Sequence, residues 1–170
     1  HIAWIRDEVV LAQASAGASC DSLPDCLRQS GTPIGRADPA VAPLGRQTEA
    51  MIQAWQELEP RLATLSLQPS SSMLVASNAA VLATWMKTRH LEQAFLYRSQ
   101  AQQNSWEKVI FPLPLSQRTL SFGIAVAANL AKKRSPAQLL DIQAFSEWLQ
   151  SVDAQTLLVN MGYLAPALPE

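Results

Sequence analysis

Residues 35–46 read Gly-Arg-Ala-Asp-Pro-Ala-Val-Ala-Pro-Leu-Gly-Arg, and this stretch decides the fold. It follows a short apolar run, and Asp38, Pro39 and Pro43 predict a rigid turn. A helix with its apolar residues on one face is expected to begin around Thr48. A proline-framed loop that leads into a helix presents unpaired backbone N–H groups at the positive end of the helix dipole, which favours anions. By itself, however, such a joint more often binds nothing.

Strands and helices are expected to alternate along the rest of the chain. The predicted strands cover residues 7–13, 62–67, 94–97, 108–111 and 120–127, and the predicted helices cover 78–88 and 136–161, the latter broken near Ser151. This alternation predicts an α/β fold with a largely parallel sheet. Ligands of such sheets bind at the carboxyl ends of strands, close to helix N-termini. The loop at Asp38, the helix cap at Asn78 and Tyr97 all lie at such ends.

Both predicted helices carry apolar residues at helical spacing, which indicates a buried face. In the first helix the inward residues are expected to be Val81, Leu82, Trp85 and Met86. In the C-terminal region they are expected to be Ala144, Phe145, Trp148, Leu149, Leu157 and Leu158.

The composition excludes several classes of function. The chain has 170 residues, 48% of them hydrophobic, which is enough for one domain, or for one lobe and part of another. Its net charge is −1 and no basic run is longer than the three residues 132–134, so nucleic-acid binding is not expected. The apolar stretches are too short to span a bilayer.

Cysteine and histidine are scarce. Cys20 and Cys26 could close a small disulfide or could be two reduced thiols, and export from the cytoplasm would favour the disulfide. The only histidines are His1 and His90, so no zinc site is expected. His90 lies at a charged helix end with Lys87, Arg89 and Glu92. Because the sequence shows no cysteine–histidine pairing and no pair of carboxylates on one apolar face, no enzymatic activity is expected.

Four segments carry a resemblance to a known family. They are Asp38-Pro-x-x-x-Pro-x-Gly45, residues 94–99 (Ala-Phe-Leu-Tyr-Arg-Ser), residues 121–126 (Ser-Phe-Gly-Ile-Ala-Val) and residues 145–163, which end in Asn-Met-Gly-Tyr. In this order and spacing they resemble the periplasmic molybdate- and tungstate-binding proteins of ABC importers. The resemblance covers nearly the whole chain from Asp7 onward.

The resemblance implies an α/β periplasmic-binding-protein type II fold, with one complete lobe, the hinge strands and the C-terminal part of the other lobe. Residues 1–13 would form a hinge strand and part of lobe I, residues 14–118 lobe II, and residues 119–170 the return hinge strand and C-terminal helices of lobe I. Residues 7–13 and 120–127 would be neighbouring strands, because they match the two interlobe crossings. The family's N-terminal segment, which supplies two serine-type ligand contacts, has no counterpart in these residues.

The resemblance also implies a ligand set. The family binds its oxyanion with backbone N–H groups at two helix starts, which fall near Leu44, Gly45 and Ala79, and with a tyrosine hydroxyl that matches Tyr97. From the residues alone, Tyr97 could equally be a core tyrosine bonded to a carbonyl. Asp38 matches a carboxylate that some members use as a ligand, but the second such position holds Leu96. Tetrahedral binding is therefore expected, with Asp38 capping the loop.

The function implied is capture of molybdate or tungstate in the periplasm for the membrane subunits of an ABC permease. No cofactor, no resident metal and no nucleic-acid partner are implied, and the chain would be a monomer unless a partner supplies the missing lobe segment. Sulfate or another ligand stays possible. The alternative is a sensory or regulatory interaction module with the same fold and a degenerate site.

Overall fold

The computed structural model describes residues 3–14, 33–58, 73–111, 113–123 and 134–165. The chain divides into two compact units, of which unit 1 comprises residues 1–7 and 121–170 and unit 2 comprises residues 8–120. Cys20, Cys26 and the strand expected over residues 62–67 lie outside the described ranges.

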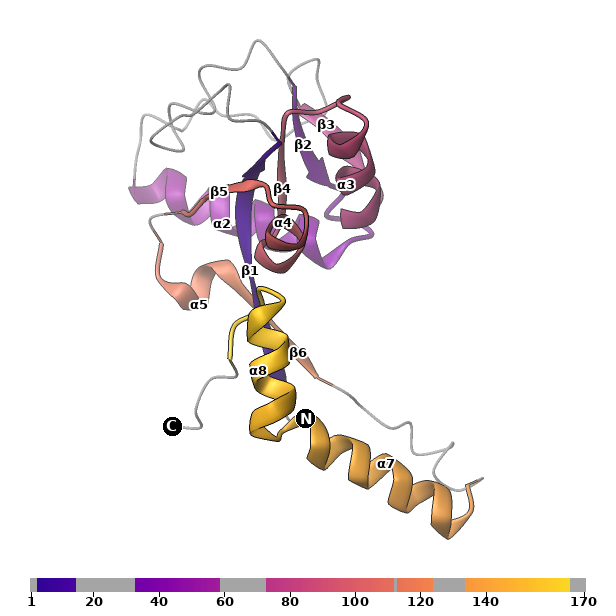
Figure 1. Ribbon diagram of the computed structural model, residues 1–170. Coiled ribbons are helices and arrows are strands. Elements are labelled where there is room, and N and C mark those ends of the chain that lie inside the picture. Colours follow the sequence, from indigo (N-terminus) through magenta and orange to yellow (C-terminus); the bar gives the residue numbers. More distant parts are fainter. Residues whose placement is uncertain (1–2, 15–32, 59–72, 112, 124–133, 166–170) are drawn as a thin grey trace. The chain divides into compact units, whose positions relative to one another are not determined.

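One mixed sheet contains all six strands of the described ranges (Figure 1). The strands are β1 (Ala3–Gln13), β2 (Ile34–Ala37), β3 (Met73–Ala76), β4 (Gln93–Tyr97), β5 (Glu107–Val109) and β6 (Thr119–Gly123). Their order is β3-β2-β4-β1-β5, and β6 also pairs with β1. The prediction that the strands around Asp7 and Leu120 are neighbours is thereby confirmed for the described part of the second strand.

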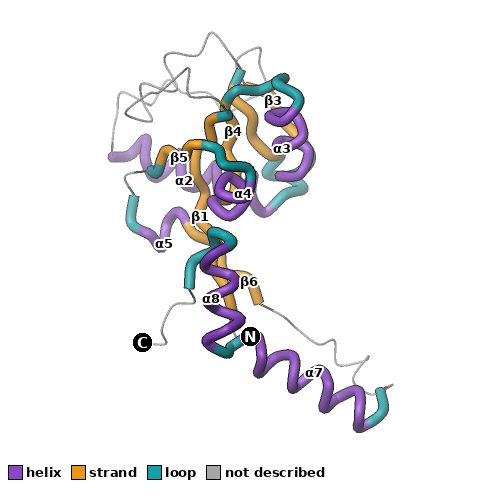
Figure 2. The backbone as a smooth tube through the Cα atoms, in the orientation of Figure 1, coloured by secondary structure: helices purple, strands orange, loops and turns teal. Residues whose placement is uncertain are grey.

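Strand direction separates the sheet into two parts. β2 runs parallel to β3 and to β4, whereas β1 runs antiparallel to β4 and to β5. The prediction of a largely parallel sheet is therefore wrong except for β2, β3 and β4. The three parallel strands therefore end at the same edge. Each leads into a helix of unit 2, namely α2 (Pro43–Leu58), α3 (Ala79–Lys87) and α4 (Arg98–Gln103), as Figure 2 shows. The short helix α5 (Leu115–Arg118) precedes β6.

The helices α2 and α3 cover opposite faces of the sheet. A side chain at Gly35 would collide with Leu82 of α3, so Gly35 and its parallel partner Ala94 face α3. Side chains alternate along a strand, so Phe95 faces the other way. There Phe111 packs against Phe95 and edge-on against Trp55 of α2, with ring centroids 5.8 and 5.7 Å apart. Such aromatic pairs add about 0.5–1.5 kcal/mol beyond the area they bury.

Helix ends in unit 2 follow the sequence signals. α2 begins at Pro43, earlier than expected, because proline suits the first helical position. α3 begins after Asn78, as predicted, and its Leu82 and Met86 are buried while Val81 and Trp85 pack partly buried against the core.

Arg36 is a charged residue in the middle of this core. Its side chain is 4% exposed, its Nη1 lies 3.4 Å from the Ala37 carbonyl, and its Nε has no hydrogen-bond partner. A buried donor without a partner destabilises the folded state.

Arg36→Met is therefore expected to raise the free energy of unfolding by about 1–2 kcal/mol, since an apolar side chain of similar length needs no partner. Urea unfolding of the two proteins measures this difference. A lower unfolding free energy in the variant would contradict the prediction.

Unit 1 contains the helices α7 (Pro136–Leu149) and α8 (Val152–Asn160). A capping box between Ser135 and Gln138 starts α7, and Ser151 caps α8, so the break predicted near Ser151 is confirmed. After α8 the chain turns at Gly162, whose φ of 97° suits glycine, and Leu164 then exchanges two backbone hydrogen bonds with Arg6.

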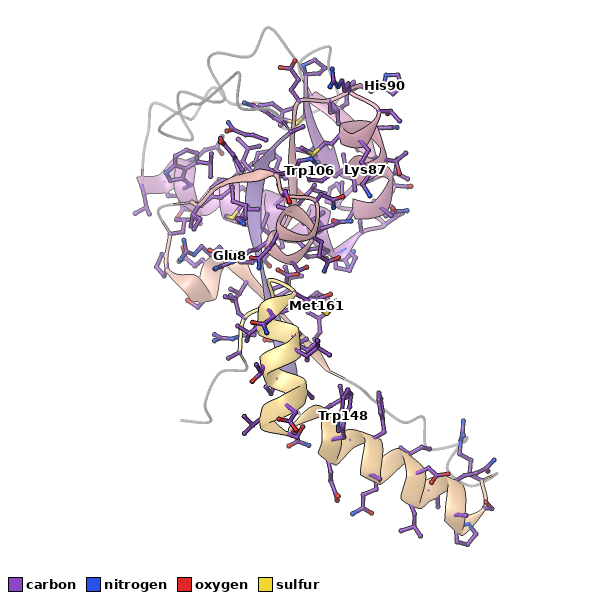
Figure 3. The ribbon with its side chains drawn as sticks, viewed as in Figure 1. Glu8, Lys87, His90, Trp106, Trp148 and Met161 are labelled. Carbon is purple, nitrogen blue, oxygen red and sulfur yellow. The ribbon has the colours of Figure 1, made fainter. Side chains whose placement is uncertain are left out.

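The buried face predicted for these two helices is wrong. Phe145 is 52% and Trp148 49% exposed, Ala144 and Leu157 are also exposed, and Leu149 and Leu158 are only partly buried. Figure 3 shows the Trp148 side chain projecting away from the α7 ribbon. The apolar pattern is present, but the described residues of unit 1 include no surface that covers it, and Ala154 is their only buried residue on either helix.

Candidate functional site

The loop before α2 is held by one aspartate. The backbone N–H of Asp38 donates to the Ala76 carbonyl of β3, and its own carbonyl accepts from Val41 and Ala42. The side-chain Oδ1 of Asp38 accepts the N–H of Ala40 at 2.8 Å, which is an Asx turn. The expected capping role of Asp38 is thus present in the geometry.

The start of α2 presents two backbone donors. Pro43 has no N–H, so the first donors of the helix are those of Leu44 and Gly45, and the first N–H groups of a helix have no partner within it. The preceding Ala42 has no side-chain oxygen to accept them. The Leu44 side chain is buried, and its carbonyl accepts the Thr48 hydroxyl at 2.8 Å, which ties the first turn together.

Gly45 allows this helix start to lie directly on the end of β2. A Cβ at Gly45 would lie 2.5 Å from the Ala37 carbonyl oxygen, and 2.6 Å from both the Asp38 carbonyl carbon and the Pro39 nitrogen. All three atoms belong to the backbone and cannot move aside as a side chain can. Only glycine fits between the loop and the helix.

The start of α3 is capped on one donor only. The Asn78 side chain accepts the N–H of Val81 at 3.0 Å. The N–H groups of Ala79 and Ala80, the first two positions of the helix, are not used by this cap. These two N–H groups lie at the N-terminal end of α3, where the helix dipole is positive, as the N–H groups of Leu44 and Gly45 do in α2.

Tyr97 is the last residue of β4 and the residue before α4. Because β2, β3 and β4 run parallel, their ends bring the start of α2, the start of α3 and the end of β4 to one edge of the sheet (Figure 1). We define the site edge as the backbone of Leu44, Gly45 and Ala79 together with Tyr97. The sequence-predicted residues are therefore gathered on one side of one unit.

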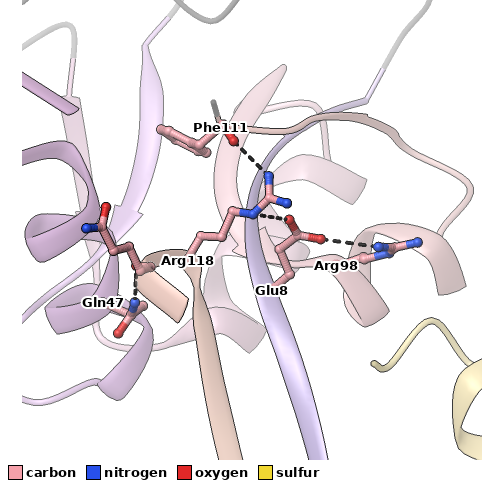
Figure 4. Close-up of polar contacts among 6 residues, drawn as sticks. Glu8, Gln47, Arg98, Phe111 and Arg118 are labelled. Atoms are coloured by element: carbon pink, nitrogen blue, oxygen red, sulfur yellow. Dashed lines mark hydrogen bonds and ion pairs between the residues drawn. The ribbon is translucent and has the colours of Figure 1, made fainter. Parts of the chain in front are cut away.

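A charged cluster beside the site edge was missed by the sequence analysis. Glu8 of β1, only 1% exposed, pairs through Oε2 with Arg98 Nη1 at 3.2 Å and through Oε1 with Arg118 Nε at 3.0 Å (Figure 4). The second contact is an ion pair without hydrogen-bond geometry. Arg118 also donates from Nη1 to the Phe111 carbonyl at 2.7 Å. The available signal was Arg98, a charge directly after the candidate tyrosine.

The described ranges were also compared with what a metal site, a histidine-based site and a membrane-spanning helix would require. No group of three or more histidine, cysteine, aspartate or glutamate side chains there could hold a metal ion. His90 is exposed, three residues after the end of α3 at Lys87. No helix in the part of the chain that the structure describes has the length and apolar character needed to cross a membrane.

Comparisons with solved structures find the same fold at low sequence identity. The Azotobacter vinelandii periplasmic molybdate-binding protein aligns with a TM-score of 0.65 at 16% identity, over 98% of this chain and 68% of that one. The substrate-binding domain assigned to a molybdenum ABC transporter of Clostridium difficile gives 0.61 and 15%, over 96% and 66%. L-phospholactate-bound PEB3 gives 0.62 and 13%, over 94% and 65%. This chain thus spans about two thirds of each.

The family comparison covers nearly the whole chain. A search of the curated proteins found no match. The sequence profile of the bacterial extracellular solute-binding proteins, however, matches residues 3–164. This extent, together with the binding-protein fold, shows that the chain belongs to the bacterial extracellular solute-binding protein family.

Proposed function

We propose that this protein captures a tetrahedral oxyanion, molybdate or tungstate, and delivers it to the membrane subunits of an ABC importer. One observation carries the proposal: three parallel strands bring two helix N-termini and a tyrosine to the same edge of the sheet. The ligand would lie between the N-termini of α2 and α3, within reach of the Tyr97 hydroxyl.

The chemistry of this edge suits an oxyanion. Backbone N–H groups and hydroxyls donate charge-assisted hydrogen bonds, which are about twice as strong as neutral ones. The helix dipoles favour negative charge at the same positions. Asp38 uses a carboxylate oxygen on the Ala40 N–H, so it acts as a cap of the loop in this proposal, and coordination stays tetrahedral.

The choice of ligand rests on two structural relatives. Molybdate is bound by the Azotobacter protein and molybdenum is named for the Clostridium transporter. The phospholactate-bound relative makes an organic phosphate the main rival ligand, since it has a tetrahedral oxyanion too. Sulfate is a second rival ligand, because it is a tetrahedral dianion like molybdate and tungstate.

The arrangement of the whole protein is part of the proposal. Residues 14–118 would form the lobe that carries the site edge, and residues 1–13 and 119–170 the hinge strands and part of the other lobe. Binding would be non-catalytic, without cofactor, in the periplasm or outside the cytoplasmic membrane. The protein would bind to the membrane subunits of the permease as a monomer.

Isothermal titration calorimetry of the full-length gene product with molybdate, tungstate, sulfate and L-phospholactate tests the proposal. We expect molybdate or tungstate to bind at least about tenfold more tightly than the other two ligands, a difference of about 1.4 kcal/mol. Tighter binding of L-phospholactate would contradict the proposed ligand, but it would still agree with the site edge as the place where an oxyanion binds. Absence of binding by all four would favour a sensory or regulatory module with the same fold.

A further inference from the structure

Glu8 is a buried carboxylate for which stability gives little reason. Its two oxygens are each paired with an arginine, and the partners are 36% exposed (Arg98) and 20% exposed (Arg118). Removing a carboxylate from water costs several kcal/mol, and apolar residues can often replace such an ion pair without loss of stability. One use of a buried pair of this kind is to hold the groups around it in a single geometry.

The strand register explains why Glu8 meets Arg98. In the antiparallel pair of β1 and β4, Val9 faces Tyr97 and Val10 faces Leu96. One step further along the same register, Glu8 faces Arg98, where β4 has just ended and α4 begins. The ion pair therefore continues the ladder by one residue after the backbone of β4 has turned into the helix.

The ion pair between Glu8 and Arg98 is connected to two parts of the site edge, Tyr97 and Ala79. Arg98 directly follows Tyr97, so its ion pair holds the end of β4 against β1. Two residues further along α4, the Gln100 side chain donates to the carbonyl of Ala79 at 3.4 Å. Ala79 is the first residue of α3, and α4 thus connects Glu8 to the start of that helix.

The ion pair between Glu8 and Arg118 is connected to the remaining part of the site edge, the start of α2. Arg118 is the last residue of α5, and the carbonyl of the neighbouring Gln117 accepts from the Gln47 side chain at 2.6 Å (Figure 4). Gln47 lies in the first two turns of α2, two residues after Gly45. Glu8 is therefore connected through its second oxygen to the start of α2.

We propose that Glu8 is a positioning residue of the oxyanion site, which holds Tyr97, the start of α3 and the start of α2 in one geometry through Arg98 and Arg118. The inference rests on the proposed function for its ligand. Glu8 acts through its two arginines and does not touch the anion, because a carboxylate would repel it.

The experiment compares Glu8→Gln with Glu57→Gln in the full-length gene product. Both variants lose one negative charge from unit 2, but Glu57 is exposed near the end of α2. Molybdate affinity is measured by calorimetry below the thermal midpoint of each protein. A ¹³C-labelled tyrosine spectrum without ligand, in which Tyr97→Phe identifies the Tyr97 signal, reports the position of Tyr97 itself.

We expect Glu8→Gln to weaken molybdate binding about tenfold, the lower end of the effect that loss of an orienting partner has at metal sites, and to shift the Tyr97 signal. Glu57→Gln should change neither. Arg98→Lys, which keeps the charge but loses the planar fork, should move both readouts in the same direction and less far. It serves as the test if Glu8→Gln does not fold.

Two outcomes separate this inference from the proposed function. A folded Glu8→Gln or Arg98→Lys protein with unchanged affinity and an unchanged Tyr97 signal would overturn the positioning role. If the parent protein binds no oxyanion, the proposed function fails, and a shifted Tyr97 signal in the ligand-free variants still supports the positioning role.

Discussion

Tyr97→Phe is expected to weaken molybdate binding about ten- to a hundredfold, a loss of about 1.5–3 kcal/mol, because it removes one hydrogen-bond donor to a charged ligand. The phenyl ring keeps the packing of the tyrosine at the end of β4, so the fold should be retained. Calorimetry of the full-length gene product measures the affinity, and thermal unfolding shows whether the variant is folded.

Tyr163→Phe is the matched control for this substitution. Tyr163 belongs to unit 1, in the segment after α8, and Tyr163→Phe removes a tyrosine hydroxyl that is not part of the site edge. It should leave the affinity within about twofold of the parent protein, a difference below 0.5 kcal/mol. Equal affinities for the parent and the Tyr97→Phe protein would mean that Tyr97 is a core tyrosine whose hydroxyl serves the fold.

Gly45→Ala is expected to lower the free energy of unfolding by about 1–3 kcal/mol, the usual cost of overpacking. The new methyl group would lie within 2.6 Å of three backbone atoms of the loop, which can give way only if the whole loop moves. Elsewhere in a helix, glycine to alanine gains up to about 1 kcal/mol, so the expected sign is opposite to the general rule. The shifted loop should also weaken oxyanion binding, since the N–H of Gly45 belongs to the site edge.

Gly35→Ala provides the comparison for Gly45→Ala. A Cβ at Gly35 would also meet close neighbours, at 2.4 and 2.8 Å, but these are the methyl ends of Leu91 and Leu82, which can change rotamer. We therefore expect a smaller loss of stability and an unchanged affinity. Urea unfolding of both variants checks the order, and a larger loss at Gly35 would contradict the explanation from backbone contact.

Much of the site edge could be predicted because its determinants are local in sequence. Asp38 and Pro43 specify a turn and a helix start, and Asn78 specifies another, through hydrogen bonds and dihedral angles within a few residues. Alternating strands and helices then imply parallel strands whose ends meet at one edge. The ligand roles of Leu44, Gly45, Ala79 and Tyr97 are still predictions, because no observation of the fold alone tests them.

The exposed face of α7 and α8 could not be predicted in the same way. Helical spacing of Phe145 and Trp148 predicts an apolar stripe, and that stripe exists. Whether a stripe is buried depends on a second surface that packs against it, and helical spacing carries no information about that surface.

By itself, the sequence determined the class of the fold, the turn at Asp38 and the start of α3 after Asn78, because backbone preferences and caps act over short distances along the chain. Only the tertiary structure brought Glu8 to Arg98 and Arg118, which lie 90 and 110 positions further along the chain. Their meeting depends on the register between β1 and β4 and on the placement of α5. These long-range pairings are fixed by the packing of the whole unit, so no local pattern around Glu8 could reveal them.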